Sequence, residues 1–466
     1  MQNFDSSHNP IIVAPTTGTA QAAVAMIRLS GSGSIDLLSQ FFKPASGASI
    51  VQAQGYSLHF GQIMQQDKVL DEVLVTIFRG PKSYTGEDVV EISCHASSYI
   101  VEQILQLCQK HGAKPAQRGE FTQRAFLNGK LDLAQAEAVG ELIASENAAS
   151  HQIALNQLKG TVSSKMQQLR SQLIRFTALI ELELDFAEED VEFADRSGLQ
   201  QLLQTLNTEL ETLISTFAYG NALKKGVPVA ILGKPNAGKS TLLNALLQEE
   251  RAIVSEIAGT TRDTIEEVLH LEGIAFRFID TAGLRSTSDT IEAIGVQRAL
   301  EKAKTAHIIL YLFNHEADDV AQIAEQLTEW QQQGSKIIAI HNKTDLVGEN
   351  MQFNEELEKL TGIEIINISA KKEQSIDLLK ERLLTKVRGT WDESQTIISN
   401  QRHHDALVQA KESLQQVKQS LDTGLSGELI SFHLRDALRS LGTVTGEIEH
   451  DRDILGTIFG EFCIGK

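Results

Sequence analysis

Apolar residues follow different spacings along this chain, and each spacing predicts a kind of structure. The first 120 residues contain short apolar or alternating runs, which are VAMIRLSG, YSLHFGQI, DEVLVTIFRG and DVVEISCH. Runs of this length between polar segments are typical of β-strands. One segment with helical spacing follows, from Ser97 to His111. The pattern therefore predicts an α+β N-terminal domain.

Two segments with helical spacing flank the middle of the chain. The first has leucines three or four positions apart, at Leu199, Leu202, Leu206, Leu210 and Leu213. The second, after Trp391, has Leu407, Leu414, Val417 and Leu421. No proline occurs from Ala116 to Val227, so long helices can form there. Because such stripes usually pack into a core, we expect an all-α helical domain.

Between these segments, short apolar runs alternate with longer amphipathic ones. The runs are VPVAILG, AHIILYLF, KIIAIHN and EIINISA. Alternating strands and helices form an α/β unit. Because the ends of a compact domain often lie close together, we expect this unit to be inserted into a discontinuous helical domain. The predicted boundaries are 1–120 for the N-terminal domain, 121–222 and 389–466 for the helical domain, and 223–388 for the inserted domain.

Composition narrows the class of protein. The 466 residues suffice for about three folded units, and 42 Lys and Arg against 61 Asp and Glu give a net charge of −19. That charge argues against indiscriminate binding to nucleic-acid backbones. No apolar run reaches the ~20 residues that cross a bilayer, and the start, MQNFDSSHNP, resembles no targeting signal. Three cysteines, Cys94, Cys108 and Cys463, make no disulfide framework. We expect a cytoplasmic protein without membrane contact.

A glycine-rich segment opens the inserted domain. GKPNAGKS, from Gly233 to Ser240, follows the strand run VAIL and precedes the helical run TLLNALL. This context is what a phosphate-binding loop requires. Its backbone N–H groups can surround phosphates, Lys239 can reach the outer phosphates and the Ser240 hydroxyl can bind Mg²⁺. The alternative is an ordinary glycine turn, but further elements of a nucleotide site follow in the right order.

Later motifs supply metal and base contacts. DTAG, Asp280 to Gly283, offers a carboxylate for the Mg²⁺ shell and an N–H for the γ-phosphate, and Thr261 in GTTRD can give a second hydroxyl to the metal. NKTD, Asn342 to Asp345, ends with a carboxylate that can accept N1–H and N2–H of guanine, which adenine cannot offer. The tripeptide Ser369, Ala370, Lys371 is similar to an element of Ras-like GTPases that backs the guanine. These motifs predict a GTP site in a Ras-like α/β P-loop domain.

The residue after DTAG affects how the attacking water is held. Ras has a glutamine there, whereas this chain has Leu284, whose alkyl side chain cannot orient water. The following loop, RSTSDTIE, offers Asp289 and Glu292, and the residues alone do not choose between them. Each could instead cap a solvated helix.

Several passages together resemble one family, the tRNA modification GTPases of the MnmE (TrmE) family. They are GKPNAGKS, AGTTRD and DTAGLRSTSDTIE in the inserted domain, with YTGEDVVEISCH, RGEFTQRAFLNGKLDLAQAEAV and the closing CIGK outside it. The resemblance spans the chain. Generic GTPases share the first group of passages but not the second.

The resemblance implies a specific function. The N-terminal domain would form a homodimer and bind (6S)-5-formyltetrahydrofolate or a related tetrahydrofolate. The chain would form a heterotetramer with the flavoprotein MnmG (GidA), which carries the FAD, and act on tRNA. The product would be an aminomethyl or carboxymethylaminomethyl group at position 5 of the wobble uridine, U34, made with a one-carbon unit from folate. GTP hydrolysis would depend on Mg²⁺ and K⁺.

The resemblance also assigns residues. It selects Glu292 over Asp289 as the catalytic carboxylate and places K⁺ at Asn236, Ser255, Ile257 and Thr260. Mg²⁺ stays at Ser240 and Thr261. Folate contacts fall on Arg28, Glu91, Lys130 and Lys466, and Cys463 becomes a candidate functional thiol. The predicted GTP-binding residues are Asn236, Ala237, Gly238, Lys239, Ser240, Thr241, Ser255, Glu256, Ile257, Ala258, Gly259, Thr260, Thr261, Asp280, Thr281, Ala282, Gly283, Asn342, Lys343, Asp345, Ser369, Ala370 and Lys371.

Alternatives stay open at several of these points. Arg28 and Lys130 could be surface charges and Glu91 a solvent-facing strand residue, and the chain departs from the family in TTGTAQAAVAMIRLSG and at Ala96-Ser97. The segment Lys110 to Lys130 is the best basic patch for tRNA, although it could instead face the folate or simply be solvated. His403, His404 and Asp405 are expected to begin a solvated helix rather than bind metal. For the whole chain, the runner-up functions are a ribosome-assembly GTPase switch and a stand-alone folate enzyme.

Overall fold

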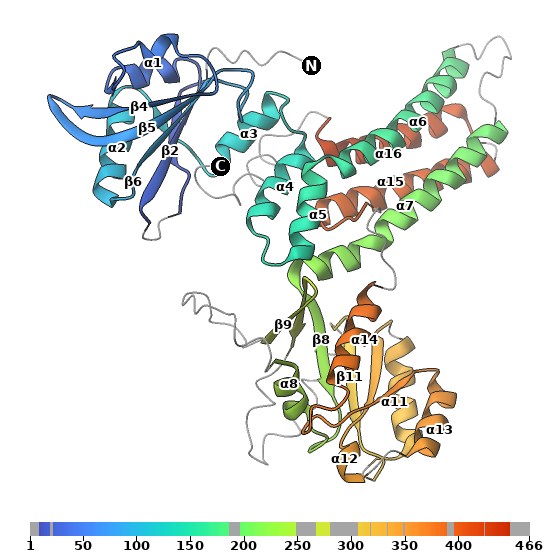
Figure 1. Ribbon diagram of the computed structural model, residues 1–466. Coiled ribbons are helices and arrows are strands. Elements are labelled where there is room, and N and C mark those ends of the chain that lie inside the picture. The colour runs from blue at the N-terminus through green and yellow to red at the C-terminus, as the bar shows by residue number, and fades with distance from the viewer. Residues whose placement is uncertain are drawn as a thin grey trace. The chain divides into compact units, whose positions relative to one another are not determined.

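The computed structural model of the protein describes residues 9–18, 22–185, 196–247, 267–279, 306–316, 318–332, 334–347, 350–388, 396–423 and 425–447 (Figure 1). The chain divides into two compact units. The first unit is formed by Met1–Ala144, Ala154–Leu210 and Asp405–Lys466, and the second by Ser145–Ile153 and Glu211–His404.

A seven-stranded sheet forms the N-terminal part of the first unit, in the order β3-β4-β5-β6-β2-β1-β7. Neighbouring strands are antiparallel except β1 and β7. The predicted strand runs correspond to β2, β4, β5 and β6. The bounds are β1 Ile12–Pro15, β2 Val24–Ser30, β3 Phe42–Pro44, β4 Ser57–Gln65, β5 Lys68–Phe78, β6 Val89–His95 and β7 Lys114–Pro115.

Helices α1 (Ser34–Ser39) and α2 (Ser98–Lys110) share a core with this sheet, and a short 3₁₀ helix spans Ile50–Gln52. Alternate strand residues such as Ile27, Val75 and Ile92 pack with Leu38 and Ile104 of the helices. This is the period-2 burial expected of strands with one covered face. The helix predicted from Ser97 to His111 is confirmed as α2, and with it the α+β character of this part.

Helices form most of the rest of the first unit. They are α3 (Glu120–Leu127), α4 (Leu133–Ile143), α6 (Thr161–Asp185) and α16 (Gly427–Thr445), with parts of α5 (Ala148–Leu158), α7 (Arg196–Lys225) and α15 (Gln401–Asp422). A capping box between Asp132 and Gln135 starts α4. The Arg435 side chain on α16 contacts Glu181 on α6 at 2.6 Å. Segments from both flanks of the chain therefore build one helical body, as expected of a discontinuous helical domain.

The leucine stripes behave as predicted. Leu199, Leu206, Leu210 and Leu213 on α7 are buried, as are Leu407, Leu414 and Val417 on α15, whereas Leu202 and Leu421 are half-buried. The prediction that His403 lies at a solvated helix start was wrong. His403 is fully buried, with Nε2 3.1 Å from Nη2 of Arg402, and the His404 ring lies 4.3 Å from that of Phe217. Among the described residues, no group of three His, Cys, Asp or Glu could hold a metal ion.

The second unit contains a six-stranded sheet in the order β13-β12-β11-β8-β10-β9, parallel except for β9. Its strands are β8 Val227–Leu232, β9 Glu267–Leu271, β10 Ile274–Phe278, β11 Ile308–Phe313, β12 Lys336–His341 and β13 Ile365–Asn367. Its helices are α8 Lys239–Leu247, α11 Val320–Gln332, α12 Thr344–Val347, α13 Met351–Thr361 and α14 Ile376–Arg388. The strand-helix alternation predicted for this segment is confirmed.

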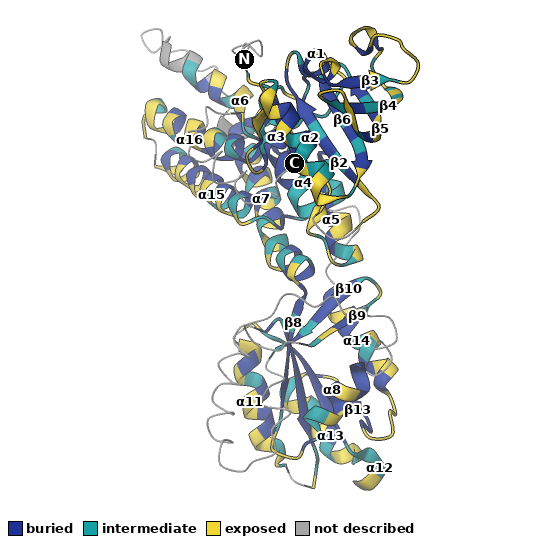
Figure 2. Ribbon diagram, turned by 90° about the vertical axis from the view of Figure 1, so that its left-hand side faces the viewer, coloured by how far each residue is buried: buried dark blue, intermediate teal, exposed yellow. Residues whose placement is uncertain are grey.

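Helices cover both faces of this sheet. One core joins α8 and α14 to residues such as Val229, Leu310 and Ile340, and another joins α11 and α13 to Ala230 and Ile309. Strands β8, β11 and β12 are buried along almost their whole length, and the dark blue of β8 shows this in Figure 2. Strands buried on both faces read as continuous apolar runs, which explains sequences such as IILYLF.

The entry and exit of this α/β part lie side by side. α7 leads into β8, and the segment after α14 returns to α7, where the backbone N–H of Ile398 donates to Thr216 Oγ1 at 3.0 Å. A Cβ on Gly220 would lie 2.6 Å from the Ile398 carbonyl oxygen, so glycine permits the close approach. This proximity of the two ends is what an inserted domain requires.

Candidate functional site

The phosphate-binding loop connects β8 to α8 at the carboxyl end of the parallel strands, where α/β sheets usually bind ligands. Gly233 has φ +143° and Gly238 has φ +100°, which favour glycine. A Cβ on Gly233 would overlap the Leu312 carbonyl oxygen, and one on Gly238 would overlap Nδ2 of Asn342. Both glycines are therefore required by close packing as well as by backbone conformation.

Lys239 begins α8 with its ammonium group folded over the loop. Its Nζ donates to the carbonyl oxygens of Gly233 and Lys234, at 2.9 Å each. The Ala237 N–H also donates to the Lys234 carbonyl, at 3.2 Å. Ser240 and Thr241 follow in the first turn of α8. The dipole at the start of α8 and the Lys239 charge together favour an anion at this loop.

The guanine motif is joined directly to the phosphate loop through Asn342. Its Nδ2 donates to the Ala237 carbonyl at 2.8 Å, and its Oδ1 accepts from the Ala370 N–H at 3.1 Å. Asp345 Oδ1 accepts from the Ser369 hydroxyl at 2.8 Å. One buried asparagine therefore links three predicted motifs that are far apart in the chain.

All the predicted nucleotide contacts that the structure describes lie at this end of the sheet. They are Asn236, Ala237, Gly238, Lys239, Ser240, Thr241, Asn342, Lys343, Asp345, Ser369, Ala370 and Lys371. The remaining predicted residues lie outside the described residues. They are Ser255, Glu256, Ile257, Ala258, Gly259, Thr260, Thr261, Asp280, Thr281, Ala282, Gly283 and Glu292, with Cys463 and Lys466 at the tail.

The sequence did not reveal a loop that supports this assembly. It follows β11, and its residue Asp318 pairs with Lys234 of the phosphate loop, with Oδ1 2.9 Å from Nζ. Asp318 belongs to no motif, and only the general rule that functional loops follow parallel strands could have drawn attention to it.

In the N-terminal sheet, Arg28 and Glu91 face one another on β2 and β6. Arg28 Nε and Nη2 each lie 2.8 Å from Glu91 Oε1, and the two side chains are 16% and 18% exposed. The guanidinium carbon lies 5.3 Å from the Tyr84 ring centroid and 5.5 Å from that of Phe121. Arg28 is therefore not a free surface charge, and Glu91 is a paired, largely covered strand residue rather than a solvent-facing one.

Lys130, the other described folate candidate, lies beside the loop that carries Tyr84. Its side chain is exposed, and its Nζ donates to the Pro81 carbonyl at 3.0 Å. A Cβ on Gly86 would lie 3.4 Å from Cγ of Lys130, so this loop and the Lys130 stem are closely packed. Tyr84 is anchored to α3 by a 2.7 Å hydrogen bond between its hydroxyl and that of Thr122.

One member of the predicted basic patch is not available to tRNA. Arg124 is 5% exposed, and its guanidinium contacts Glu87 at 3.1 Å and Glu120 at 2.9 Å. It also donates to the Pro10 carbonyl at 2.9 Å. Arg124 therefore holds the N-terminal segment to α3, and the exposed basic residues of this segment are Lys110, Lys114, Arg118 and Lys130.

The two cysteines within the described residues are poor nucleophiles. Burial, with a contribution from the Asp71 carboxylate, raises the pKa of Cys94 to about 11, and burial raises the pKa of Cys108 to about 12. Thiolates carry the reactivity of cysteine. Both residues therefore serve packing in the α2 core.

We predict that Cys94 and Cys108 react slowly with thiol reagents in the folded protein. At pH 8 the thiolate fraction of each is expected to be about a hundredfold or more below that of a free cysteine. Labelling of a Cys463→Ser variant with Ellman's reagent should be slow in buffer and complete in denaturant. Rapid labelling of the folded variant would contradict the prediction.

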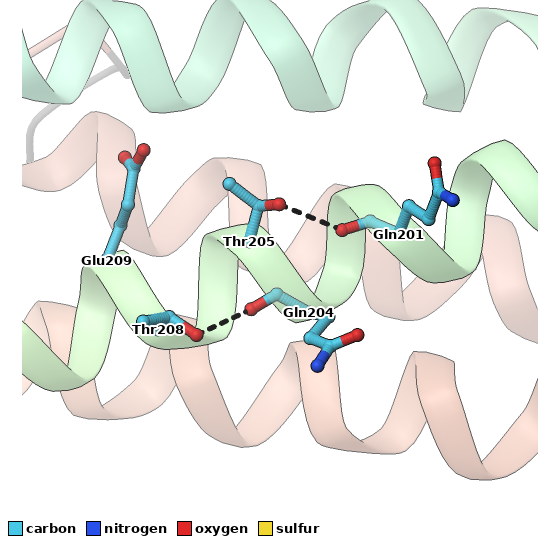
Figure 3. A pocket seen from close by; sticks show the side chains of 5 residues that line it. All are labelled: Gln201, Gln204, Thr205, Thr208 and Glu209. Carbon is cyan, nitrogen blue, oxygen red and sulfur yellow. Dashed lines mark hydrogen bonds between the residues drawn. The ribbon is translucent and has the colours of Figure 1, made fainter.

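A hollow of about 500 Å³ along α7 is lined by Gln201, Gln204, Thr205, Thr208 and Glu209 (Figure 3). Thr205 and Thr208 donate back to the Gln201 and Gln204 carbonyls of their own helix, at 3.0 Å each. These hydroxyls satisfy the helix backbone, so the hollow offers no arrangement for catalysis.

Within the described residues, no helix is long and apolar enough to cross a membrane.

Comparison with known proteins gave matches over nearly the whole chain. A family model described as the GTP-binding protein TrmE N-terminus matches residues 11–130, and one described as the MnmE helical domain matches residues 133–463. The tRNA modification GTPase MnmE of Flavobacterium johnsoniae is 48% identical over 463 residues, covering 98% of this chain and 99% of that protein. The protein of the same name from Cytophaga hutchinsonii is 46% identical, covering 99% of each. A crystal structure of Aquifex aeolicus Era bound to GDP and AlF4⁻ matches with 26% identity over 40% of this chain and 66% of that chain, at a TM-score of 0.26.

Proposed function

The chain belongs to the MnmE (TrmE) family, and from this membership we propose that it is a GTPase that takes part in tRNA modification. The observation that supports this most strongly is the joined nucleotide site, in which Asn342 links the phosphate loop to the guanine motif. The related proteins that carry the name tRNA modification GTPase MnmE extend over almost the full length of this chain.

In the proposed GTP site, each motif binds a different part of the nucleotide or the metal. The phosphate loop and Lys239 would hold the phosphates, and Asp345 would read the N1–H and N2–H groups of guanine. Mg²⁺ would bind at Ser240, in the first turn of the helix that follows the phosphate loop, together with Thr261. The metal supplies positive charge for the phosphate oxygens. Asp280 to Gly283 would contact the γ-phosphate.

In the finer proposal, the chain works with the flavoprotein MnmG (GidA) in the cytoplasm. Together they would form a heterotetramer that modifies position 5 of U34 in certain tRNAs, with FAD on the partner. Exposed Lys110, Lys114, Arg118 and Lys130 are the described basic residues that could contact tRNA phosphates. The buried Arg124 is left out of this set.

The proposed folate site centres on the Arg28–Glu91 pair. Arg28 contacts Oε1 of Glu91 through both Nε and Nη2, so the arginine orients the carboxylate. Carboxylates accept hydrogen bonds from the N–H groups of a pterin, and the flat faces of Tyr84 and Phe121 beside Arg28 suit a planar ring. Lys130 and Lys466 would pair with the carboxylates of the folate glutamate.

We predict that Glu91→Gln weakens folate binding more than Lys130→Met does. The amide replaces a charged acceptor by a neutral one at the centre of the site, whereas the lysine is exposed and screened by water. Isothermal calorimetry with 5-formyltetrahydrofolate should show at least a tenfold loss of affinity for Glu91→Gln. Equal binding by Glu91→Gln and the unaltered chain would remove Glu91 from the site.

The proposed homodimer has support on the outer face of β4 and β5. Phe60 and Leu74 lie opposite one another in the sheet register, and Leu58 lies two residues along the same face. Leu58 and Phe60 are 63% and 52% exposed. An apolar row of this kind on a sheet face favours burial against another surface, and the family resemblance names a second copy of the chain as the partner.

Potassium is proposed at Asn236, Ser255, Ile257 and Thr260. Asn236 has φ +61° and lies exposed in the phosphate loop, so its side-chain oxygen can reach a cation next to the phosphates. A cation there would stabilise charge that develops during hydrolysis, which other GTPases achieve with an arginine.

We predict faster GTP turnover in KCl than in NaCl at equal ionic strength, by about tenfold or more, because Na⁺ is smaller and fits a different coordination shell. Steady-state phosphate release measures the rates, and GTP affinity in the two salts serves as the control. Equal rates would refute the potassium site while leaving the GTP site intact.

The full-length match favours tRNA modification over the ribosome-assembly switch and over a stand-alone folate enzyme, because the matched models include the N-terminal and helical parts. Nucleoside analysis of tRNA tests the choice. A strain without this protein should lack the 5-aminomethyl-type wobble uridines, and the GTPase gene should restore them. Normal wobble uridines in that strain would remove the tRNA-modification proposal.

A further inference from the structure

A loop that carries no nucleotide motif touches both halves of the nucleotide site. It follows β11 in the second unit, and we name it the β11 loop after its described residues, Asn314, His315, Glu316 and Asp318. Hydrogen bonds within the loop give it a definite shape. The Asn314 N–H donates to Asp318 Oδ2 at 2.8 Å, and the Asp318 N–H donates to the Asn314 carbonyl at 3.0 Å.

At the phosphate end, the contact runs through Asp318. This side chain is only 2% exposed, and its Oδ1 lies 2.9 Å from Nζ of Lys234, whose side chain is 48% exposed. A buried carboxylate is stable when a cation and hydrogen-bond donors neutralise it, and Lys234 and the Asn314 N–H do so here. The ion pair therefore fixes the Lys234 side chain against the β11 loop.

Lys234 also contacts Lys239, the lysine proposed to bind the phosphates. The Lys234 carbonyl accepts from Nζ of Lys239 at 2.9 Å and from the Ala237 N–H at 3.2 Å. An ammonium group has three donors, and two of those on Lys239 are directed by the carbonyls of Gly233 and Lys234. The position of the Lys234 backbone therefore sets the direction in which Lys239 meets the phosphates.

At the guanine end, the contact runs through His315. Its Nδ1 lies 2.9 Å from Nε2 of His341, the buried residue directly before Asn342. His341 also stacks on Phe313 with ring centroids 5.2 Å apart, and its carbonyl accepts from the Ile368 N–H at 2.9 Å, just before Ser369. Burial, and then the neighbouring His315, lower the pKa of His341, so its ring is neutral at pH 7.

We propose that the β11 loop is a positioning element of the nucleotide site. Asp318 holds the phosphate loop in place through Lys234, and His315 holds the guanine motif in place through His341. We call these two sets of contacts the Asp318 arm and the His315 arm. Neither side chain needs to touch the nucleotide. The inference rests on the proposed GTP-binding function and deepens it. One arm of the loop positions the residues that bind the phosphates, and the other positions the residues that bind the guanine.

The Asp318 arm predicts a uniform loss of nucleotide affinity. Asp318→Asn should raise the Kd of GTP and of ITP by about tenfold each, because both carry the same phosphates, while kcat at saturating GTP changes less than about twofold. Lys234→Met should have a similar effect. Because the two residues act through each other, the double variant should bind no more weakly than either single variant.

The His315 arm predicts a loss of base selectivity. ITP lacks the N2 amine of guanine, so it makes one contact fewer with Asp345. His315→Leu should weaken GTP by about fivefold and ITP by less, which narrows the preference for GTP, and His315→Gln, which keeps a hydrogen-bonding group, should restore part of it. Fluorescent-nucleotide titration with the full chain measures all of these constants.

Glu316 of the loop and Asp319, which follows it, provide matched controls. Asp319 is exposed and accepts from the Ala321 and Gln322 N–H groups, and asparagine keeps this cap, so Asp319→Asn removes one charge without touching the loop contacts. Glu316→Gln does the same beside His315. Melting curves show whether each variant is folded.

The outcomes separate the two levels of the proposal. If the unaltered chain binds no GTP, the proposed function fails. If it binds GTP but Asp318→Asn matches Asp319→Asn, or the Asp318 and Lys234 effects multiply in the double variant, the Asp318 arm is wrong. If His315→Leu weakens GTP and ITP equally, or binds both as Glu316→Gln does, the His315 arm is wrong.

Discussion

Replacing Asp345 with Asn is expected to lower the affinity for GTP by about 10²- to 10⁴-fold and to favour XTP instead. The Asp345 carboxylate can accept both N1–H and N2–H of guanine. In the variant, the Ser369 hydroxyl, which donates to Oδ1 at 2.8 Å, would hold the amide oxygen in that place. The amide NH₂ would then face the guanine N2 amine, donor against donor. Xanthine has a carbonyl there, which can accept from the NH₂ group.

Competition between GTP and XTP for a fluorescent nucleotide measures this change in preference. Lys372→Met is the matched control, because Nζ of Lys372 lies 3.9 Å from Oδ2 of Asp345 and is 61% exposed. A screened surface charge of this kind contributes little, so the control should bind GTP within about threefold of the unaltered chain. Retention of GTP preference by Asp345→Asn would show that NKTD does not read the base.

Replacing Glu292 with Ala is expected to lower the kcat of GTP hydrolysis by about 10²- to 10⁴-fold while the Kd of GTP changes little. The expectation follows from Leu284, which stands where Ras has its water-orienting glutamine, and from the family resemblance, which assigns that task to Glu292. The binding motifs around Lys239 and Asp345 are untouched by the substitution. Glu292 lies outside the described residues, so its placement stays a prediction.

Asp289→Ala is the matched control, because Asp289 was the alternative carboxylate in the same loop. Single-turnover measurements in KCl separate hydrolysis from product release. A large loss of turnover in Asp289→Ala with little change in Glu292→Ala would reverse the assignment. Normal turnover in both variants would place the water-orienting group elsewhere.

Local pattern was enough to predict most of the fold. The alternation in VAMIRLSG and DVVEISCH predicted β2 and β6, the leucine spacing predicted α7 and α15, and continuous apolar runs predicted the parallel strands. A strand repeats every 2.0 residues and a helix every 3.6, so the spacing of apolar residues within a short stretch of sequence indicates each of them directly. The phosphate loop and NKTD were readable for a related reason, because each motif carries its chemistry within a few consecutive residues.

Only the tertiary structure decided which distant residues meet. Arg28 pairs with Glu91 because β2 and β6 are antiparallel neighbours with that register, and Arg124 is buried because α3 packs it against Glu87. His403 is buried because its side of α15 is covered by other parts of the protein, and the neighbouring residues in the sequence do not indicate this. Asp318 reaches Lys234 because β11 lies beside β8. Strand order and side-chain environment arise from the whole chain packing at once, so the sequence determined the elements and motifs, and packing decided their partners.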